Sequence, residues 1–262
     1  MGNHPLDAGE DGMTTLAFLG QFGDAIQFIF QGETSREGAE IGGSQFLELT
    51  WEHVKLSGVA MAIACLISIP AGLWLGHIRR FSFVAISASN VGRAVPSLAL
   101  IAFFVAYLGV GFANLTLALV LLAIPPILTN SYVGVTQVNP ESVDASRGMG
   151  MTETEIVRKV ELPLALPLIF GGIKTSAVNV IATATIAPLA GVSTLGDPII
   201  NVSGYGDTGR LAAAIVVASL AVLTELLLSA AQRAATPRGI KLEANPSRRR
   251  RLPTRIGRAA ST

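Results

Sequence analysis

The side chains that most often perform chemistry are few and scattered in this sequence. Its histidines, His4, His53 and His77, lie far apart, and its single cysteine, Cys65, lies in an apolar run. These residues do not have the spacing of a metal site, and one cysteine cannot form an internal disulfide. The stretch GGIKTS, residues 171–176, lacks the spacing of a phosphate-binding loop. We therefore expect this chain to bind no metal, nucleotide or other cofactor itself.

The composition indicates a protein of the membrane. Half of the residues are hydrophobic and 14% are charged, against roughly a quarter charged in an ordinary soluble domain. No charge occurs from Leu56 to Gly76, or from Ala94 to Pro140. A spanning helix needs about 20 apolar residues, so the second block holds two spans joined by a turn at Gly109–Asn114. We predict an all-α integral membrane protein rather than a soluble protein with buried helices.

The apolar blocks predict five transmembrane helices, and the cations predict their direction. The spans are Leu56–Gly76, Phe81–Leu108, Leu115–Val138, Leu164–Leu189 and Leu211–Ala231. Lysine and arginine gather in the turn His77–Arg80, in the interruption Asn139–Pro163 and in the tail after Ala231. The positive-inside rule places these three segments in the cytoplasm. We expect a multi-pass protein of the cytoplasmic membrane with its C-terminus in the cytoplasm.

The two ends of the chain differ in charge. We expect an acidic N-terminal segment at 1–51, a spanning domain at 52–232 and a basic, disordered cytoplasmic tail at 233–262. Thr14–Phe30 is short and contains polar residues, which favours an interfacial amphipathic helix; a sixth span is the alternative. Phe46–Ser57 is interpreted as a second amphipathic lead-in. The arginines of the tail would be attracted to anionic membrane lipid, and we expect no nucleic-acid partner.

The interruption at 139–163 contains a series of helix boundary signals. Asn139 followed by Pro140 is typical of a helix start, and Gly148 and Gly150 are suited to a helix end. Thr152 with Glu155 predicts a capping box at the start of a second helix, which runs to Pro163. We expect a rigid helix, a glycine elbow and another helix, which is a docking element or a lever.

This loop resembles a family signature. In the inner-membrane subunits of binding-protein-dependent ABC importers the signature is E-A-A, three residues, Gly, nine residues and I-x-L-P, and this chain has Asp144-Ala145-Ser146, Gly150 and Val160-Glu161-Leu162-Pro163 at that spacing. The substitutions are Asp for Glu, Ser for Ala and Val for Ile. The resemblance implies a type I ABC importer transmembrane domain whose first loop helix is a coupling helix.

In that family the coupling helix sits in a cleft on the ATP-binding subunit. The resemblance therefore implies roles in coupling for Asp144, Ala145, Ser146 and Gly150, with Leu162 and Pro163 completing the motif. The small Ala145 and Ser146 would allow close seating, and Gly150 the turn. ATP and Mg²⁺ would be bound by the partner ATPase subunit.

Two further stretches are similar to the permeases of osmoprotectant importers. These are GRAVPSLALIAFF, residues 92–104, and LAGVSTLGDPII, residues 189–200. The resemblance covers roughly 52–231 and implies import of glycine betaine, choline, carnitine or proline betaine. It also implies a second permease chain, identical or related, and a separate extracytoplasmic substrate-binding protein.

Polar side chains within the spans are candidates for a translocation path. The candidates are Asn90, Arg93, Asn130, Tyr132, Asn179 and Thr183. Arg93 is either a functional intramembrane charge or a side chain that reaches back to the interface, and Lys174 could pair with Glu225. The prolines Pro96, Pro125 and Pro126 are expected to interrupt their spans, and Gly72, Gly76, Gly171 and Gly172 are expected at close helix contacts.

Other functions stay open at this stage. The same architecture could import another small solute, such as methionine or a sulfonate. An ATP-independent osmolyte channel is a second alternative, in which the capped loop would have no motor to engage. An intramembrane hydrolase is disfavoured because the spans contain no nucleophile with a neighbouring base.

Overall fold

A computed structural model describes residues 10–34, 40–79, 83, 87 and 94–236. The architecture is helical, with one small pair of strands, β1 (Glu33–Thr34) and β2 (Glu40–Ile41), which run antiparallel. The longer helices are α1 (Glu10–Gln31), α2 (Gly43–His77), α4 (Ser97–Leu108), α5 (Phe112–Thr136), α8 (Leu162–Thr183) and α10 (Val202–Ala235). The shorter elements are α6 (Pro140–Gly148), α7 (Glu153–Ile156), η1 (Val157–Glu161), η2 (Ala184–Ala190) and α9 (Gly196–Ile200).

Four helical segments in the described part are long and apolar enough to cross a membrane: α2, α5, the continuous rod Glu153–Ala190 and α10. They contain the first, fourth and fifth predicted spans, and α5 contains the third except for its last two residues. Of the second predicted span, the structure describes α4, a 12-residue helix that begins directly after Pro96. Proline cannot donate a backbone hydrogen bond within a helix, which explains why α4 begins there. Residues 88–93 lie outside the described residues.

Helix α2 begins earlier than the sequence predicted. The lead-in at 46–57 is not a separate helix, because α2 continues unbroken from Gly43 through the apolar run. The predicted boundary between residues 51 and 52 therefore falls inside one helix. Trp51 is exposed on this part of α2, whereas Phe46 is buried.

Helix α5 also differs from its prediction, since Pro125 and Pro126 lie inside a continuous helix. Neighbouring helices supply hydrogen bonds beside the prolines. The hydroxyl of Ser176 on α8 donates to the carbonyl of Ala123 at 2.9 Å, and that of Ser68 on α2 donates to Ile124 at 3.4 Å. The carbonyls that lose their helical donor are those of Leu121 and Leu122, four residues before each proline, so these two hydroxyls do not replace the missing bonds; they tie α2 and α8 to α5 beside the prolines.

The core lies where α2 and α8 pack against α5. A Cβ built on Gly72 would lie 2.5 Å from the Cβ of Ser131, and one on Gly76 would lie 2.7 Å from that of Val135. On the other side of α5, a Cβ on Gly172 would lie 2.7 Å from the carbonyl oxygen of Pro126. Three of the four predicted glycine contacts are confirmed; Gly171 has only ordinary contact. Small residues allow this close approach of membrane helices.

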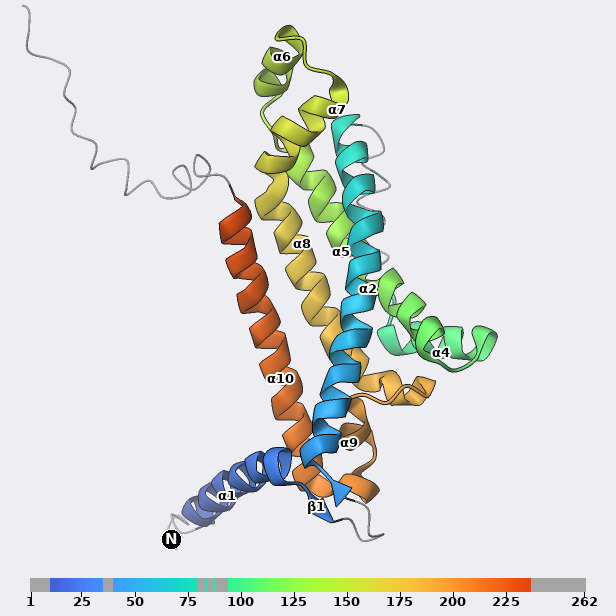
Figure 1. Cartoon of the computed structure of the whole chain (residues 1–262), viewed down its shortest axis with the longest axis vertical. Helices are drawn as coiled ribbons and strands as arrows, with labels where there is room; N and C mark the ends of the chain where they lie inside the picture. The colour runs from blue at the N-terminus through green and yellow to red at the C-terminus, as the bar shows by residue number, and fades with distance from the viewer. Residues whose placement is uncertain (1–9, 35–39, 80–82, 84–86, 88–93, 237–262) are drawn as a thin grey trace, which may run out of the picture.

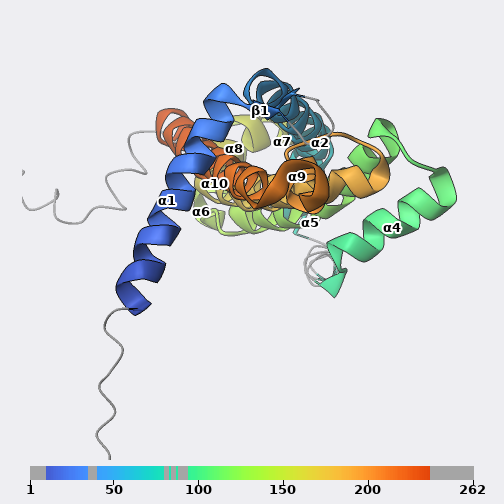
Figure 2. The ribbon, with the colours of Figure 1, turned by 90° about the horizontal axis from the view of Figure 1, so that it is seen from below.

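The helices form an elongated bundle with distinct ends (Figure 1). The loop elements α6 and α7 lie at one end, and α1, β1 and α9 lie at the other. The C-terminus of α10 points toward the end that carries α6. In the view from below, α1 and α4 project from opposite sides of the bundle (Figure 2).

Helix α1 is not among the apolar spanning helices in the described part of the chain. Its C-terminal half is anchored to the bundle, where Phe28 meets Phe46 of α2 edge to face at 5.9 Å between ring centroids. Phe28 also lies against Gly209 of α10. The projection of α1 across the end of the bundle (Figure 1) fits the predicted interfacial helix, which stays a prediction.

Candidate functional site: the loop between α5 and α8

Helix α6 has the start and the end that its sequence predicts. The side chain of Asn139 accepts a hydrogen bond from the backbone of Glu141 at 2.9 Å, and Pro140 occupies the first turn. The helix ends at Gly148, and Gly150 has a φ of +82°, in the left-handed region that glycine adopts without strain. The glycine elbow is confirmed.

The second half of the loop starts with the predicted capping box. The Thr152 hydroxyl accepts from the backbone of Glu155 at 3.4 Å, while the Glu155 carboxylate accepts from the backbone of Thr152 at 3.1 Å. Helix α7 then continues through the π-helical turn η1 into α8 without a break. Pro163, near the start of α8, lacks a backbone donor, and a π-turn is one way to accommodate such a change.

A small apolar core holds the two halves of the loop together. Val143 of α6 packs with Val138 and Ile156, and Ile156 is fully buried. Met151 and Val160 pack against this group from the elbow and from η1. The loop is therefore a folded unit with its own packing, as the punctuation of the sequence predicted.

The structure separates the residues that the signature groups together. Asp144, Ala145 and Gly150 are exposed, and α6, which carries the first two, lies at the end of the bundle (Figure 1). Ser146 differs from the expectation, because it is only 4% exposed and its hydroxyl donates to the carbonyl of Ser142 at 2.7 Å. It shares a buried face with Val143, one helical turn away. Ser146 thus packs within the loop and is not available for seating against a partner.

Leu162 and Pro163 occupy a different place from α6. Both are half-buried at the start of α8, and Leu162 packs against the cluster formed by Val135, Ala165 and Ile169. They join the loop to the spanning bundle, and they do not extend the exposed surface of α6.

A group of ionic side chains ties the loop to α2, and the sequence analysis missed it. We define the His77 cluster as His77, Glu153, Glu161 and Arg147. His77, at the end of α2, contacts Glu161 of η1 through Nδ1 at 2.8 Å and Glu153 of α7 through Nε2 at 3.0 Å. Arg147 of α6 reaches Glu153 through Nε at 2.9 Å and through Nη2 at 3.1 Å. The cluster connects α2 with α6, α7 and η1.

Burial differs strongly across the His77 cluster. The side chains of His77 and Glu161 are 6% and 2% exposed, whereas those of Arg147 and Glu153 are 45% and 53% exposed. Hydrogen bonds from Arg147 lower the pKa of the Glu153 carboxyl, which keeps this group ionised at neutral pH. A further hydrogen bond, from Arg79 to the carbonyl of Val138 at 3.2 Å, joins the end of α2 to the start of the loop.

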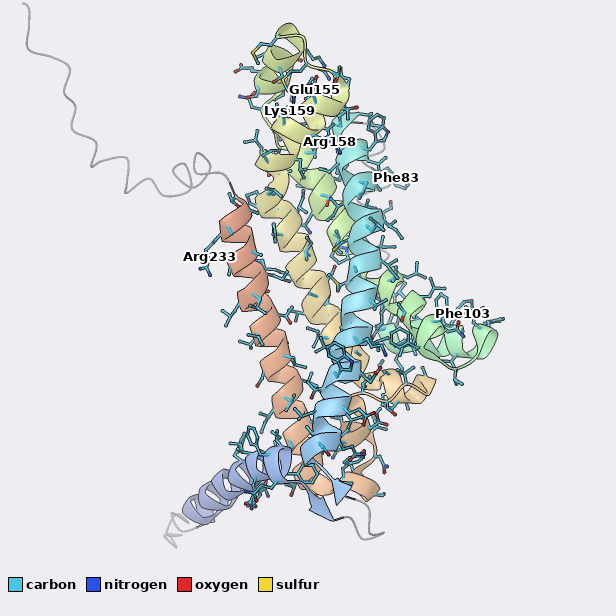
Figure 3. All side chains as sticks on the ribbon, viewed as in Figure 1. Phe83, Phe103, Glu155, Arg158, Lys159 and Arg233 are labelled. Carbon is cyan, nitrogen blue, oxygen red and sulfur yellow. The ribbon has the colours of Figure 1, made fainter. Side chains whose placement is uncertain are left out.

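Further charges lie on the outer surface of this end. Glu155, Arg158 and Lys159 are grouped near α7, and Glu155 pairs with Lys159 at 2.8 Å across one helical turn (Figure 3). Both partners of that pair are well exposed, and exposed pairs contribute little stability. This end of the bundle therefore presents a polar, charged face.

The predicted path residues do not form one group. Asn90 and Arg93 lie outside the described residues. Asn130 donates to the carbonyl of Pro126 at 2.8 Å on the face of α5 toward α8, and Tyr132 is 7% exposed, with its backbone against the glycines of α2. Asn179 is exposed and Thr183 half-buried on α8, one turn apart on one face.

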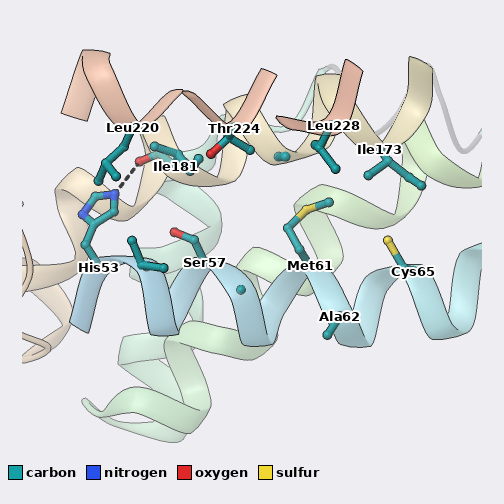
Figure 4. Close-up of a pocket in the computed structure, with 13 residues that line it drawn as sticks. His53, Ser57, Met61, Ala62, Cys65, Ile173, Ile181, Leu220, Thr224 and Leu228 are labelled. Atoms are coloured by element: carbon teal, nitrogen blue, oxygen red, sulfur yellow. Dashed lines mark hydrogen bonds between the residues drawn. The ribbon is translucent and has the colours of Figure 1, made fainter. Parts of the chain in front are cut away.

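A cavity of about 280 Å³ lies between α2, α8 and α10 (Figure 4). It is lined mainly by apolar side chains, among them Met61, Ile173 and Leu220. At one end His53 contacts the carbonyl of Ile181 through Nε2 at 3.0 Å, which assigns the proton to that nitrogen. The Nδ1 atom of His53 and the hydroxyl of Ser57 have no hydrogen-bond partner among the described residues. Asn179 and Thr183 lie on a different face of α8 from this cavity.

Lys174 and Glu225 join α8 to α10, which is the pairing that the sequence analysis gave as possible. The lysine Nζ lies 3.5 Å from a carboxylate oxygen of Glu225, and it donates to the hydroxyl of Ser229 at 3.4 Å. Charged side chains within spanning helices are expected to pair in this manner.

Comparison with known proteins identifies the fold and the family. Residues 68–240 match the family described as the binding-protein-dependent transport system inner membrane component. This match covers more than half of the chain and includes the whole of the loop just described. The chain belongs to this family.

Curated members of this inner-membrane component family align over most of their length. The choline transport system permease protein OpuBB of Bacillus subtilis is 36% identical over 77% of this chain and 94% of its own. The carnitine transport permease protein OpuCB of Listeria monocytogenes is 36% identical over 76% of this chain and 92% of its own. These relatives are transport permeases, and this chain is likewise a membrane permease component of an ABC transporter.

Solved structures have the same fold as this inner-membrane component. The MetNI methionine ABC transporter, in an inward-facing conformation, aligns with a TM-score of 0.64 at 23% identity, over 73% of this chain and 96% of that chain. An amino acid ABC transporter crystallised with histidines aligns with a TM-score of 0.57 at 21% identity, over 72% of this chain and 93% of that chain. The fold is that of a type I ABC importer transmembrane domain, as the resemblance implied.

Proposed function

We propose that this chain is the permease subunit of an ATP-driven importer that carries osmoprotectants such as glycine betaine, choline, carnitine or proline betaine across the cytoplasmic membrane. The observation that supports coupling to a motor is α6, a capped helix with an exposed Ala145 at the end of the bundle. The substrate class is supported by relatives that are named for choline and carnitine transport.

The complex needs further subunits. Two permease chains, identical or related, pair with two ATP-binding subunits, which bind ATP and Mg²⁺ and hydrolyse the nucleotide. A separate extracytoplasmic protein captures the solute and delivers it. This chain performs no covalent chemistry; its exposed Asp144, Ala145 and Gly150 contact the ATP-binding subunit.

ATP drives a switch between outward-facing and inward-facing states. Nucleotide binding closes the pair of ATP-binding subunits and displaces α6. The small apolar core of the loop transmits this displacement to the continuous rod of α7, η1 and α8. Such a switch requires that ATP bind the two states with different affinity.

The proposed orientation has α6 and the C-terminus in the cytoplasm. The cations Arg79, Arg147, Arg158 and Lys159 are at the α6 end, which the positive-inside rule assigns to the cytoplasm. The basic tail at 233–262 then faces anionic lipid, and the acidic segment at 1–51 is on the outer side. Asn130, Tyr132, Asn179 and Thr183 remain our candidates for the path within the described chain, and Asn90 and Arg93 remain candidates outside it.

Uptake of labelled solutes tests the substrate class. A strain that lacks this chain is compared with the parent for uptake of choline, glycine betaine and methionine under osmotic stress. We expect loss of choline or betaine uptake and unchanged methionine uptake. The reverse result would assign another substrate to the same architecture, which is the runner-up function.

An ATP-independent channel is tested separately at the elbow. Gly150 has a positive φ, so Gly150→Trp both strains the turn and enlarges the surface near α6. A coupled importer loses uptake in this variant, and a channel keeps it. Purification in detergent followed by mass spectrometry identifies the ATP-binding and second permease subunits that accompany the parental chain.

A further inference from the structure

The buried contact between His77 and Glu161 connects the end of α2 directly to η1 of the loop. Glu161 is almost fully buried, and its carboxylate contacts a histidine from a helix 84 positions away in the sequence. A buried carboxylate without a partner is costly. The contact therefore constrains α2 and η1 to keep one relative position at this point.

The same imidazole is shared with the outer part of the loop. Its second nitrogen contacts Glu153 at the start of α7, and Glu153 is held by Arg147 of α6. The two ring nitrogens of His77 therefore each meet a carboxylate, Nδ1 that of Glu161 and Nε2 that of Glu153. One side chain of α2 thus binds both ends of the segment formed by α7 and η1.

Helix α2 is the long helix whose glycines pack most closely against α5. Gly76 directly precedes His77, and Gly72 lies one helical turn before Gly76. The two glycines face Val135 and Ser131 of α5, respectively. A displacement applied to His77 therefore acts directly on the α2–α5 contact. The rod of α8 receives motion of the loop through the backbone, but α2 receives it through side chains.

We infer that His77 is a positioning residue that makes α2 move with the coupling loop, so that ATP hydrolysis is converted into solute movement. This rests on the proposed function, in which α6 engages an ATP-binding subunit. His77 and Glu161 contribute the buried half of the connection, and Arg147 and Glu153 contribute the exposed half. The role is distinct from docking, because His77 and Glu161 are not on the exposed surface of α6.

The test uses the whole complex, coexpressed and reconstituted in liposomes, with ATP hydrolysis and uptake of labelled choline and glycine betaine measured together. We expect His77→Ala to retain the ATP-binding subunit and to hydrolyse ATP, but to import about tenfold less solute per ATP. The double variant His77→Gln with Glu161→Gln replaces the imidazole and the carboxylate by two neutral amides that can still hydrogen-bond to each other. We expect it to recover most of the coupling, as a purely electrostatic role would not allow.

A variant at an exposed position keeps the inference testable if substitutions of the buried His77 and Glu161 prevent folding. Glu153→Gln weakens the link between Arg147 and His77 at a half-exposed position, and we expect a smaller loss of solute per ATP, about threefold. Glu155→Gln is the matched control, because the side chain of Glu155 is bonded to Thr152 and Lys159 within the same segment, and glutamine keeps an acceptor for the capping box while it loses the charge. It should couple normally.

The inference fails if His77→Ala and Glu153→Gln both import as much solute per ATP as Glu155→Gln. That result leaves the proposed function intact. Failure of the proposed function has a different signature: the parental complex itself would lack an ATP-binding subunit, or would import solute at the same rate without ATP.

Discussion

Gly72 of α2 faces Ser131 of α5 so closely that a Cβ on the glycine would lie 2.5 Å from the serine Cβ. That separation is far inside van der Waals contact, so the two helices can meet at this crossing because residue 72 has no side chain. The contact joins two of the spanning helices directly below the loop that carries α6.

This contact predicts a contrast between two glycines of one helix. Gly72→Ala should lower the stability of the detergent-solubilised protein by about 1–3 kcal/mol, because α2 and α5 must separate. Gly58→Ala is the control, since a Cβ there meets nothing within 4 Å. Thermal unfolding of the two variants is the measurement; equal midpoints would contradict the packing described for α2 and α5.

The first residue of α9, Gly196, is a second obligatory glycine. A Cβ on Gly196 would overlap the carbonyl of Thr185, so Gly196→Ala should displace α9 and cost about 3 kcal/mol. Gly23→Ala in α1, where no atom lies within 4 Å, serves as the comparison. Thermal stability and yield of monodisperse protein report the effect, and a Gly196→Ala protein as stable as the parent would show that the turn can relax.

The exposed face of α6 predicts a loss of assembly. Ala145→Glu adds bulk and charge on that face without touching the buried Val143 and Ser146, so the permease should fold but lose its ATP-binding subunit. Docking surfaces are sensitive to a charge placed in a closely packed position, and we expect the amount of copurified subunit to fall at least about tenfold. Thr154→Glu, an exposed position on α7, should leave it unchanged. Retention of the subunit by the Ala145→Glu chain would exclude α6 as the docking helix.

The contact between Lys174 and Glu225 predicts a non-additive result. Lys174→Met leaves a carboxylate without its cation between α8 and α10, whereas Lys174→Met combined with Glu225→Met removes both charges. We expect the single variant to be less stable than the double variant by about 1 kcal/mol. The double-mutant cycle consists of the unfolding midpoints of the parent, Lys174→Met, Glu225→Met and the double variant. If the two single changes in stability add up to that of the double variant, Lys174 and Glu225 do not interact.

Local features of this chain were predictable because their causes lie close in the sequence. The cap at Asn139, the capping box of Thr152 and Glu155, and the elbow at Gly150 each depend on residues within one or two turns. The apolar blocks predicted the spanning helices for the same reason. The glycine contacts of α2 also followed from spacing alone.

Features that depend on distant partners were not predictable. Nothing near His77 in the sequence indicates Glu161, and a histidine beside arginines is equally typical of a solvated turn. The inward orientation of Ser146 depends on Val143 and Ile156 packing together, so the signature alone could not separate it from Ala145. Pro125 and Pro126 were expected to break α5, but α5 continues through them, and Ser68 of α2 and Ser176 of α8 hydrogen-bond to it beside the prolines.

The lengths of α8 and of the helical turns before it bear on how far from the lipid a partner can bind. The run from α7 through η1 into α8 is continuous. Its longest α-helical part, α8, has 22 residues, which at about 1.5 Å per residue gives about 33 Å, close to a hydrocarbon layer of about 30 Å. Because α8 is long enough to span the layer by itself, α7, η1 and the elbow at Gly150 are additional to the length that spanning requires. A soluble subunit that docks on α6 can therefore bind this chain without colliding with the bilayer, because α7 and η1 separate α6 from the spanning helix α8.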